Sequence, residues 1–201
     1  MPAAPGTKER TRRALLLAGI EVLSSDPSAP LGEVAEQAGV ARSTLHRYFP
    51  DRASLMSAAA QLADQEYEAA FARARTSEGT ALEGFRRLCL ELMDALDVLI
   101  WWIGPGDASR DAGECVEPSE TEAPDGAPQD SEVRIAQLVE RGHADGTIDP
   151  ALSALWVENL LWANVYIIFT ARQTREMPVA EAQIQALRSL LKAVAVDPSS
   201  I

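Results

Sequence analysis

The stretch from Pro150 to about Thr174 constrains the fold more than any other part of this sequence. Its apolar residues fall on nearly every side of a helix, and a helix that is apolar on all sides must be covered on all sides. Glu158, Asn159 and Asn164 interrupt the run, which does not fit a membrane span. The segment therefore predicts a buried helix with one face on its own domain and the other on a second subunit.

The rest of the chain also favours helices over strands, because Ala and Leu are abundant and aromatic residues make up only 5%. Helical periodicity and Gly or Pro breaks predict further helices over residues 7–23, 31–38, 41–49, 52–76, 80–103, 132–143 and 178–196. We therefore expect an all-α protein. Residues 1–53 would form a three-helix head with a helix-turn-helix, and residues 54–201 a helical C-terminal bundle.

One acidic segment differs from everything around it. Residues 104–132 contain four Gly, four Pro and nine acidic residues, against the single basic residue Arg110. Such a stretch buries too little apolar surface to offset the entropy lost on ordering. We predict that the segment at about 104–131 is mobile.

The charge is distributed unevenly along the chain. The net charge is −12, yet residues 1–53 hold seven basic against six acidic residues, so the remainder carries −13. This balance excludes diffuse affinity for nucleic acid and leaves room for one small docking face in the head.

Catalytic and metal-binding chemistry finds no support in the sequence. Cys89 and Cys115 form neither a disulfide framework nor a metal-ligand spacing, and His46 and His143 make no triad. We expect no enzyme activity, no metal and no cofactor. The charged N-terminus resembles no secretory signal, so a cytoplasmic protein without membrane attachment is expected.

Residues 31–55, LGEVAEQAGVARSTLHRYFPDRASL, form the most informative motif. The pattern predicts a helix, a turn at Gly39, a second helix anchored from beneath by Leu45 and Phe49, and a third helix capped by Asp51. The outward side of the second helix gathers hydrogen-bond donors and a basic pair, which suit base edges and phosphates in a DNA major groove. These residues are Arg42, Ser43, Thr44, His46, Arg47 and Tyr48.

This segment resembles the DNA-binding head of the TetR family of bacterial transcriptional regulators. The family pattern reads roughly IA-x-x-AGVS-x-x-TLYxYF-x-x-K-x-x-L, and it is matched at residues 34–35, 38–40, 44–49, 52 and 55. The stretch GHADGTIDP before the long C-terminal helix, together with the all-helical layout, extends the resemblance over most of the chain.

The resemblance implies roles for individual side chains. Arg42, Ser43 and Thr44 would lie nearest the base edges, while Thr44 and Tyr48 would donate to phosphates. The predicted DNA-binding set is Arg42, Ser43, Thr44, His46, Arg47, Tyr48 and Arg52, with Lys8 and Arg10 from an N-terminal arm.

Three positions depart from the family pattern. His46 replaces a Tyr, which weakens one phosphate contact when the imidazole is neutral and favours DNA binding at lower pH. Ala41 and Pro30 stand where Ser or Thr would cap helices, and a missing cap costs about 1 kcal/mol. These changes predict a less rigid head or a different operator.

The family keeps its effector cavity among the helices behind the head. The residues that we predict to line it are Cys89, Met93, Leu96, Trp101, Trp156, Asn159, Trp162 and Tyr166. Aromatic residues at helical spacing are equally compatible with a core or an interface. The surplus apolar surface of the two C-terminal helices predicts a four-helix dimer interface with Leu161, Val165, Ile168, Ile184, Leu187 and Leu191.

Together these features predict a homodimeric regulator, in the first instance a repressor, that binds double-stranded DNA at a palindromic operator and is released by a small-molecule effector. The alternative is a TetR-like dimer that serves as a scaffold or partner-binding protein and has lost operator binding. The acidic residues 54–201 of this chain and its missing helix caps favour that alternative, whereas Thr44, Tyr48 and Arg52 argue against it.

Overall fold

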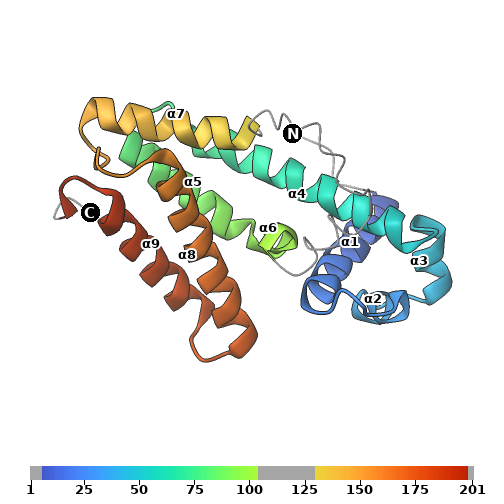
Figure 1. Cartoon of the computed structure of the whole chain (residues 1–201). Helices are drawn as coiled ribbons and strands as arrows, with labels where there is room; N and C mark the ends of the chain where they lie inside the picture. The colour runs from blue at the N-terminus through green and yellow to red at the C-terminus, as the bar shows by residue number, and fades with distance from the viewer. Residues whose placement is uncertain (1–5, 104–129, 199–201) are drawn as a thin grey trace, which may run out of the picture. The chain divides into compact units, whose positions relative to one another are not determined.

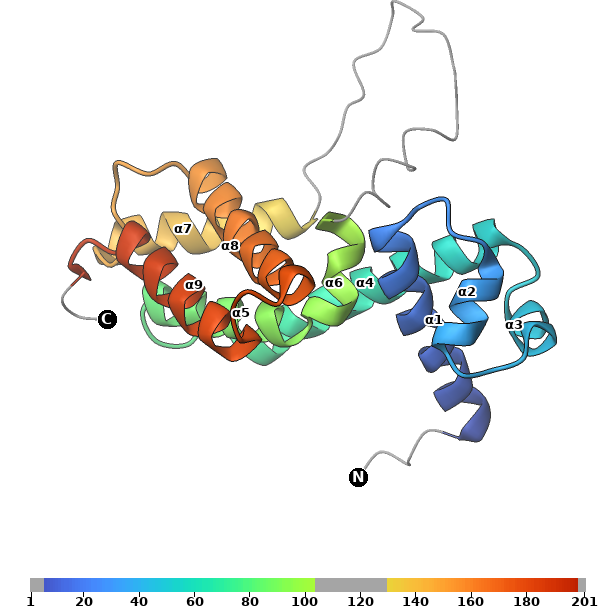
Figure 2. The ribbon, with the colours of Figure 1, turned by 90° about the horizontal axis from the view of Figure 1, so that it is seen from below.

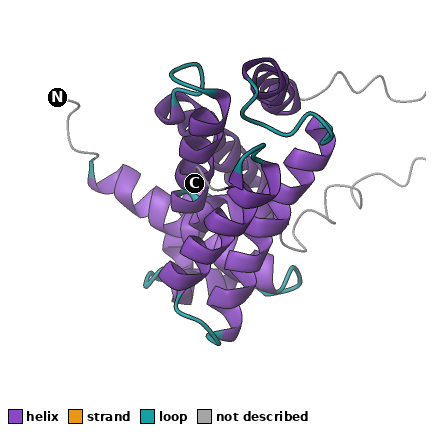
Figure 3. Ribbon diagram, turned by 90° about the vertical axis from the view of Figure 1, so that its left-hand side faces the viewer, coloured by secondary structure: helices purple, strands orange, loops and turns teal. Residues whose placement is uncertain are grey.

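The computed structural model describes residues 6–103 and 130–198, and within these ranges the regular structure is helical (Figures 1 and 3). The one β feature in the described ranges is an isolated bridge between Ile148 and Ala195. The predicted all-α class, with a helix-turn-helix head and a helical C-terminal region, is confirmed. The helices are α1 Thr7–Ser25, α2 Leu31–Gln37, α3 Arg42–Tyr48, α4 Arg52–Ala74, α5 Ala81–Asp94, α6 Leu96–Ile103, α7 Asp130–Asp145, α8 Ala154–Thr174 and α9 Val179–Val194.

The described residues pack as two compact units, residues 6–67 with 97–103, and residues 68–96 with 130–198. The predicted head boundary at residue 53 falls inside the first unit, because the first part of α4 belongs to its core. Leu55 of α4 is fully buried, and its methyl groups lie 3.2 Å from the point where a Cβ on Gly19 of α1 would sit. Gly19 thus lets α4 approach α1 closely.

The turn between α2 and α3 depends on Gly39. Val40 N donates to Ala35 O at 2.9 Å and Gly39 N donates to Glu36 O at 2.9 Å, the pair of bonds that closes a Schellman motif. Gly39 has a φ of 67°, in the left-handed region that favours glycine. The turn predicted at Gly39 is confirmed, and Asp51 accepts a hydrogen bond from Ser54 N at 2.7 Å as the predicted cap of α4.

Two predicted helices differ from the structure by more than two residues at an end or by a break. The helix expected over residues 80–103 is interrupted at Ala95 between α5 and α6, and α6 belongs to the first unit from Asp97 onward. The ring of Trp102 on α6 packs 5.2 Å from that of Tyr67. No Gly or Pro marks this break, so periodicity alone gives no sign of it. α8 begins at Ala154, because Ser153 caps it by accepting from Trp156 N at 3.3 Å.

The second unit contains α5, α7, α8 and α9, with α8 and α9 side by side (Figure 2). A capping box between Thr80 and Glu83 starts α5. Asp145 accepts hydrogen bonds from Ala81 N and from Thr147, which hold its pKa below the ordinary value against the opposing effect of desolvation. The predicted mobile segment at about 104–131 lies outside the described residues, except that 130–131 belong to the start of α7.

Among the described residues of one chain, α8 is covered on one face. Val157, Leu161, Val165 and Ile168 are buried, while the opposite side exposes apolar residues. In the described residues α8 is the one helix long and apolar enough to cross a membrane, a criterion that a bundle helix with a buried face also meets. We predicted that α8 is buried on all sides. The described residues of the subunit bury one side of it, and the cover predicted for the other side, a second subunit, stays a prediction.

The turn at Gly39 yields a stability prediction. A Cβ on Gly39 would meet no atom within 4 Å, so Gly39→Ala changes only the backbone preference and should lower the free energy of unfolding by about 1–2 kcal/mol. Urea denaturation measures this change. The control is Gly32→Ala, which is equally unobstructed but lies inside α2, and it should raise stability by about 0.5–1 kcal/mol. Equal effects of the two substitutions would contradict the assignment.

Candidate nucleic-acid interface

Helix α3 is held by its buried side. Leu45 is fully buried and Phe49, directly after the helix, is 3% exposed. Beneath them lie Val34 and Ala35 of α2, which are also buried. Because α3 has only seven residues, this packing rather than intrinsic helix stability keeps it in place.

The other side of α3 carries polar groups. Arg42, Ser43, His46 and Arg47 are exposed, and Thr44 and Tyr48 are half-buried. The guanidinium of Arg47 lies 5.5 Å from the ring centre of Tyr48, which orients both side chains along the end of the helix. The structure thus brings six of the predicted DNA-binding residues onto one short helix, where the exposed ones can reach a groove.

His46 and the helix ends complete this surface. The Nδ1 of His46 lies 3.3 Å from Pro50 O, so one ring nitrogen stands next to the turn that follows α3. Neither Ala41 nor Pro30 makes a side-chain cap, as expected from their residue types. The start of α3 therefore presents backbone N–H groups that no side chain has taken, which is the arrangement that favours a phosphate.

Arg52 lies at the start of α4, as the resemblance implied, and makes hydrogen bonds inside the head. Its Nη1 donates to Ala29 O at 2.7 Å, and its Nη2 donates to Pro27 O. The guanidinium therefore ties the start of α4 to the loop between α1 and α2. We infer that Arg52 positions the head, and the sequence motif alone gave no signal of this contact.

Lys8 and Arg10 lie in the first turns of α1, since the helix begins at Thr7. Both are exposed, and Arg10 Nη2 lies 3.4 Å from Thr7 Oγ1. Arg12, which follows them on α1, places its guanidinium 5.9 Å from the ring centre of Phe49. The basic residues of α1 are therefore helical, and Arg12 links that helix to the end of α3.

Arg13 of α1 forms a salt bridge. Its Nη2 lies 2.7 Å from Glu66 Oε1 on α4, within the same unit. This pair neutralises Arg13, so it adds little to the positive charge that the head offers to phosphates. The charge available there comes from Lys8, Arg10, Arg42 and Arg47.

The residues predicted to line an effector pocket are not gathered in one cavity that the structure describes. Cys89, Met93, Leu96 and Trp101 are buried in the cores of their own units, and burial raises the pKa of the Cys89 thiol. Trp156, Asn159 and Tyr166 are exposed on α8, and Trp162 is half-buried. Tyr166 lines a cavity of about 590 Å³ between α8 and α9. The location of an effector pocket stays a prediction.

The residues predicted for a dimer interface also divide. Leu161, Val165, Ile168 and Leu191 fill the core of the subunit and have almost no surface left for a partner. Ile184 is 67% exposed and Leu187 is half-buried. A helix that is apolar on nearly every side has no preferred azimuth, so the sequence could not assign its inward face. The interface remains a prediction, carried by Ile184 and Leu187 among these six.

Within residues 6–103 and 130–198, no group of three or more His, Cys, Asp or Glu side chains could hold a metal ion. The candidate site is the exposed polar side of α3, whose buried apolar side holds it in the helix-turn-helix head. A larger helical unit follows the head. This architecture defines a helix-turn-helix protein.

Comparison with known proteins shows which helix-turn-helix proteins this chain resembles. The model of the bacterial regulatory proteins of the tetR family matches residues 15–70. The HTH-type transcriptional repressor LfrR of Mycolicibacterium smegmatis is 40% identical over 96 residues, which cover 48% of this chain and 51% of LfrR. The chain thus matches about half the length of this curated relative.

Solved structures extend the similarity to most of the chain. The crystal structure of LfrR from Mycobacterium smegmatis is 26% identical with a TM-score of 0.56, covering 89% of this chain and 95% of that one. LfrR in complex with proflavine is 27% identical with a TM-score of 0.60, covering 92% and 96%. The ketosteroid transcriptional regulator of Mycobacterium tuberculosis is 16% identical with a TM-score of 0.62, covers 92% and 95%, and shares the fold.

The chain contains a domain of the tetR family of bacterial regulatory proteins at residues 15–70. The family predicted from the motif at residues 31–55 is confirmed, and it consists of regulators rather than enzymes.

The contacts of Arg52 give a prediction that separates a positioning role from a DNA contact. Arg52→Gln removes two charge-assisted hydrogen bonds and should lower the free energy of unfolding by roughly 1–3 kcal/mol. Chemical denaturation measures it, with Arg47→Gln at an exposed position as the control that leaves stability within about 0.5 kcal/mol. An Arg52→Gln protein of unchanged stability would show that Arg52 does not position the head.

Proposed function

We propose that this protein is a transcriptional repressor that binds double-stranded DNA as a homodimer in the bacterial cytoplasm. The observation that carries the proposal is the exposed side of α3, where Arg42, Ser43 and Arg47 stand free above a buried Leu45. Such a helix fits a major groove, and its guanidinium groups suit guanine O6 and N7 or phosphates. The similarity to LfrR, itself a transcriptional repressor, supports this assignment.

The charge distribution supports a specific rather than a diffuse contact. The whole chain carries −12, so its acidic second part repels DNA except where the head docks. Binding then depends on a small number of well-placed contacts, and Thr44 and Tyr48 beside the arginines would supply donors to phosphates.

A homodimer would place two copies of α3 on successive major grooves of a palindromic operator. The surface for it is the exposed apolar side of α8 and α9. Trp156 and Ile167 on α8 are 56% and 55% exposed, and Ile184 on α9 is 67% exposed. Exposed side chains of this size on two adjacent helices suit a four-helix contact between two identical subunits.

A small-molecule effector would act through the second unit. LfrR has been solved in complex with proflavine, which supports a small-molecule ligand for the present chain and makes proflavine the first probe. Effector and operator would each lower the affinity for the other by the same coupling free energy.

The rival function, a dimeric scaffold without operator binding, draws on the uncapped starts of α2 and α3. It predicts that substitutions on the exposed side of α3 leave every interaction of the protein unchanged. The DNA-binding measurement below therefore separates the two functions.

Fluorescence-anisotropy titration with DNA from upstream of the protein's own gene tests the proposal. We expect binding at nanomolar concentrations that weakens steeply with salt and is lost with scrambled DNA. Arg42→Ala with Tyr48→Phe should weaken binding at least a hundredfold, since each contact contributes about 1–3 kcal/mol. Arg86→Ala, at an exposed position on α5, is the matched control and should bind as the original protein does. Weak binding that is indifferent to sequence and to the double substitution, also with genomic fragments, would favour the scaffold.

The dimer is tested by analytical ultracentrifugation of Ile184→Asp. A charge in an apolar interface should raise the dimer dissociation constant at least a hundredfold, or about 3 kcal/mol, because it is buried without a partner. Leu90→Asp is the control, since Leu90 is an exposed apolar residue on α5. Dissociation by Leu90→Asp and not by Ile184→Asp would place the interface elsewhere.

A further inference from the structure

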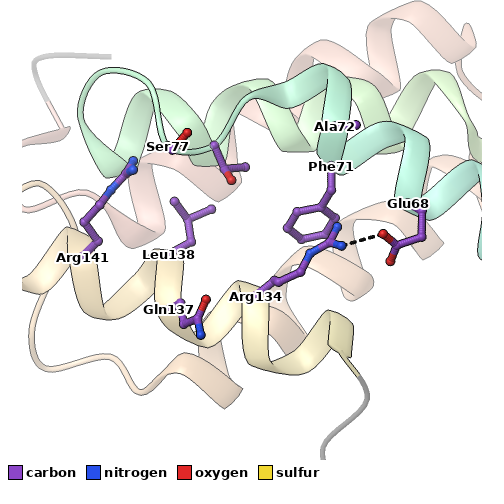
Figure 4. A pocket seen from close by; sticks show the side chains of 9 residues that line it. Glu68, Phe71, Ala72, Ser77, Arg134, Gln137, Leu138 and Arg141 are labelled. Atoms are coloured by element: carbon purple, nitrogen blue, oxygen red, sulfur yellow. Dashed lines mark hydrogen bonds and ion pairs between the residues drawn. The ribbon is translucent and has the colours of Figure 1, made fainter.

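A cavity of about 430 Å³ lies between α4 and α7 in the second unit (Figure 4). Its apolar lining includes Phe71 and Ala72 of α4 and Leu138 of α7, and its polar lining includes Ser77, Gln137 and Arg141. None of these residues belongs to the predicted DNA-binding surface. The cavity is large enough for a small organic molecule.

At one end of the cavity the charged side chains are paired. Arg134 Nη1 lies 2.6 Å from Glu68 Oε2, and the Arg134 guanidinium covers the ring of Phe71 at 3.9 Å from its centre. Figure 4 shows this pair at one side of the cavity and Arg141 at the other, with Leu138 and Gln137 between them. The balanced pair leaves no free charge for a ligand at that end.

The other end holds a cation without a partner. The Nε and Nη2 of Arg141 are buried, and neither finds a hydrogen-bond acceptor among the described residues. The side chain as a whole is only half-buried and still lines the cavity. Buried N–H groups without acceptors are costly, and more so when they carry a charge.

Neighbouring groups make hydrogen bonds that do not include Arg141. Arg87 donates to the carbonyls of Ala74, Arg75 and Glu78 where α4 ends. The carboxylate of Asp145, which feels the charge of Arg141, accepts instead from Ala81 and Thr147.

Gly84 on α5 makes the space that the guanidinium occupies. A Cβ on Gly84 would lie 3.3 Å from Arg141 Nη2 and 2.6 Å from Thr76 O. The guanidinium is thus packed against a helix where a side chain is missing, and the carboxylate in the cavity lining, that of Glu68, is paired with Arg134.

We propose that this cavity binds an organic carboxylate with an apolar chain. Arg141 would pair with the carboxylate, with the Ser77 hydroxyl on the same side of the cavity as a further donor. The chain of the ligand would lie over Leu138 toward Phe71 and Ala72. Among the described lining residues, Arg141 is the charged side chain that forms no salt bridge, so an anion is favoured over a cation. This inference does not depend on DNA binding.

Isothermal titration calorimetry with three probes of equal chain length tests the proposal on the full chain. Octanoate should bind the unmodified protein at least tenfold more tightly than octan-1-ol, and octylammonium should give no saturable heat. Equal binding of octanoate and octan-1-ol, or tighter binding of octylammonium, would overturn the proposal, and this comparison needs no variant.

Variants then locate the charge. Arg141→Met keeps an unbranched apolar chain and should lose at least tenfold in octanoate affinity, whereas Arg141→Lys, which keeps the charge, should recover part of that loss. Arg86→Met removes an exposed arginine outside the cavity and should bind octanoate unchanged. Octanoate binding that survives Arg141→Met, in a protein with an intact helical spectrum, would contradict the assignment. A purely structural role for Arg141 would change stability without changing the preference for octanoate over octan-1-ol.

Discussion

The burial of Leu45 and Phe49 is the constraint on which the head depends. A helix of seven residues without an N-cap does not hold together in water, so α3 exists because its apolar side is packed on α2. The same packing decides which residues stay outside. Once Leu45 points inward, the helical period turns Ser43 and Arg47 toward solvent, and Arg42 is exposed at the start of the helix, where a nucleic acid can reach all three.

The remaining devices of the head keep this small core in register. Gly39 gives the turn between α2 and α3 a left-handed residue, Gly19 lets α4 lie close to α1, and Arg52 fastens the loop before α2 through two carbonyl groups. Arg52 therefore acts through positioning. At this position of the motif the structure has a contact inside the head.

The head was largely predictable because local signals determine it. Gly39, the spacing of Val34, Leu45 and Phe49, and Asp51 before α4 each specify a neighbourhood of a few residues. The second unit was less predictable because its signals are non-local. No residue type marks the break at Ala95. Because α8 carries apolar residues on nearly every side, its sequence does not indicate which face packs inward. The groups around Arg141 come from α5, α7 and the turn after α4, so no sequence spacing connects them.

The central claim is that the exposed side of α3 enters the DNA major groove. Dimethyl sulfate probing of a bound DNA fragment, obtained by genomic selection, tests it most directly, because guanine N7 lies in the major groove and adenine N3 in the minor groove. The account predicts protection of guanine N7 in two half-sites about one helical turn apart, roughly 34 Å, with adenine N3 largely unprotected between them. Protection confined to adenine N3, or no protection at a concentration that saturates the fragment, would contradict it.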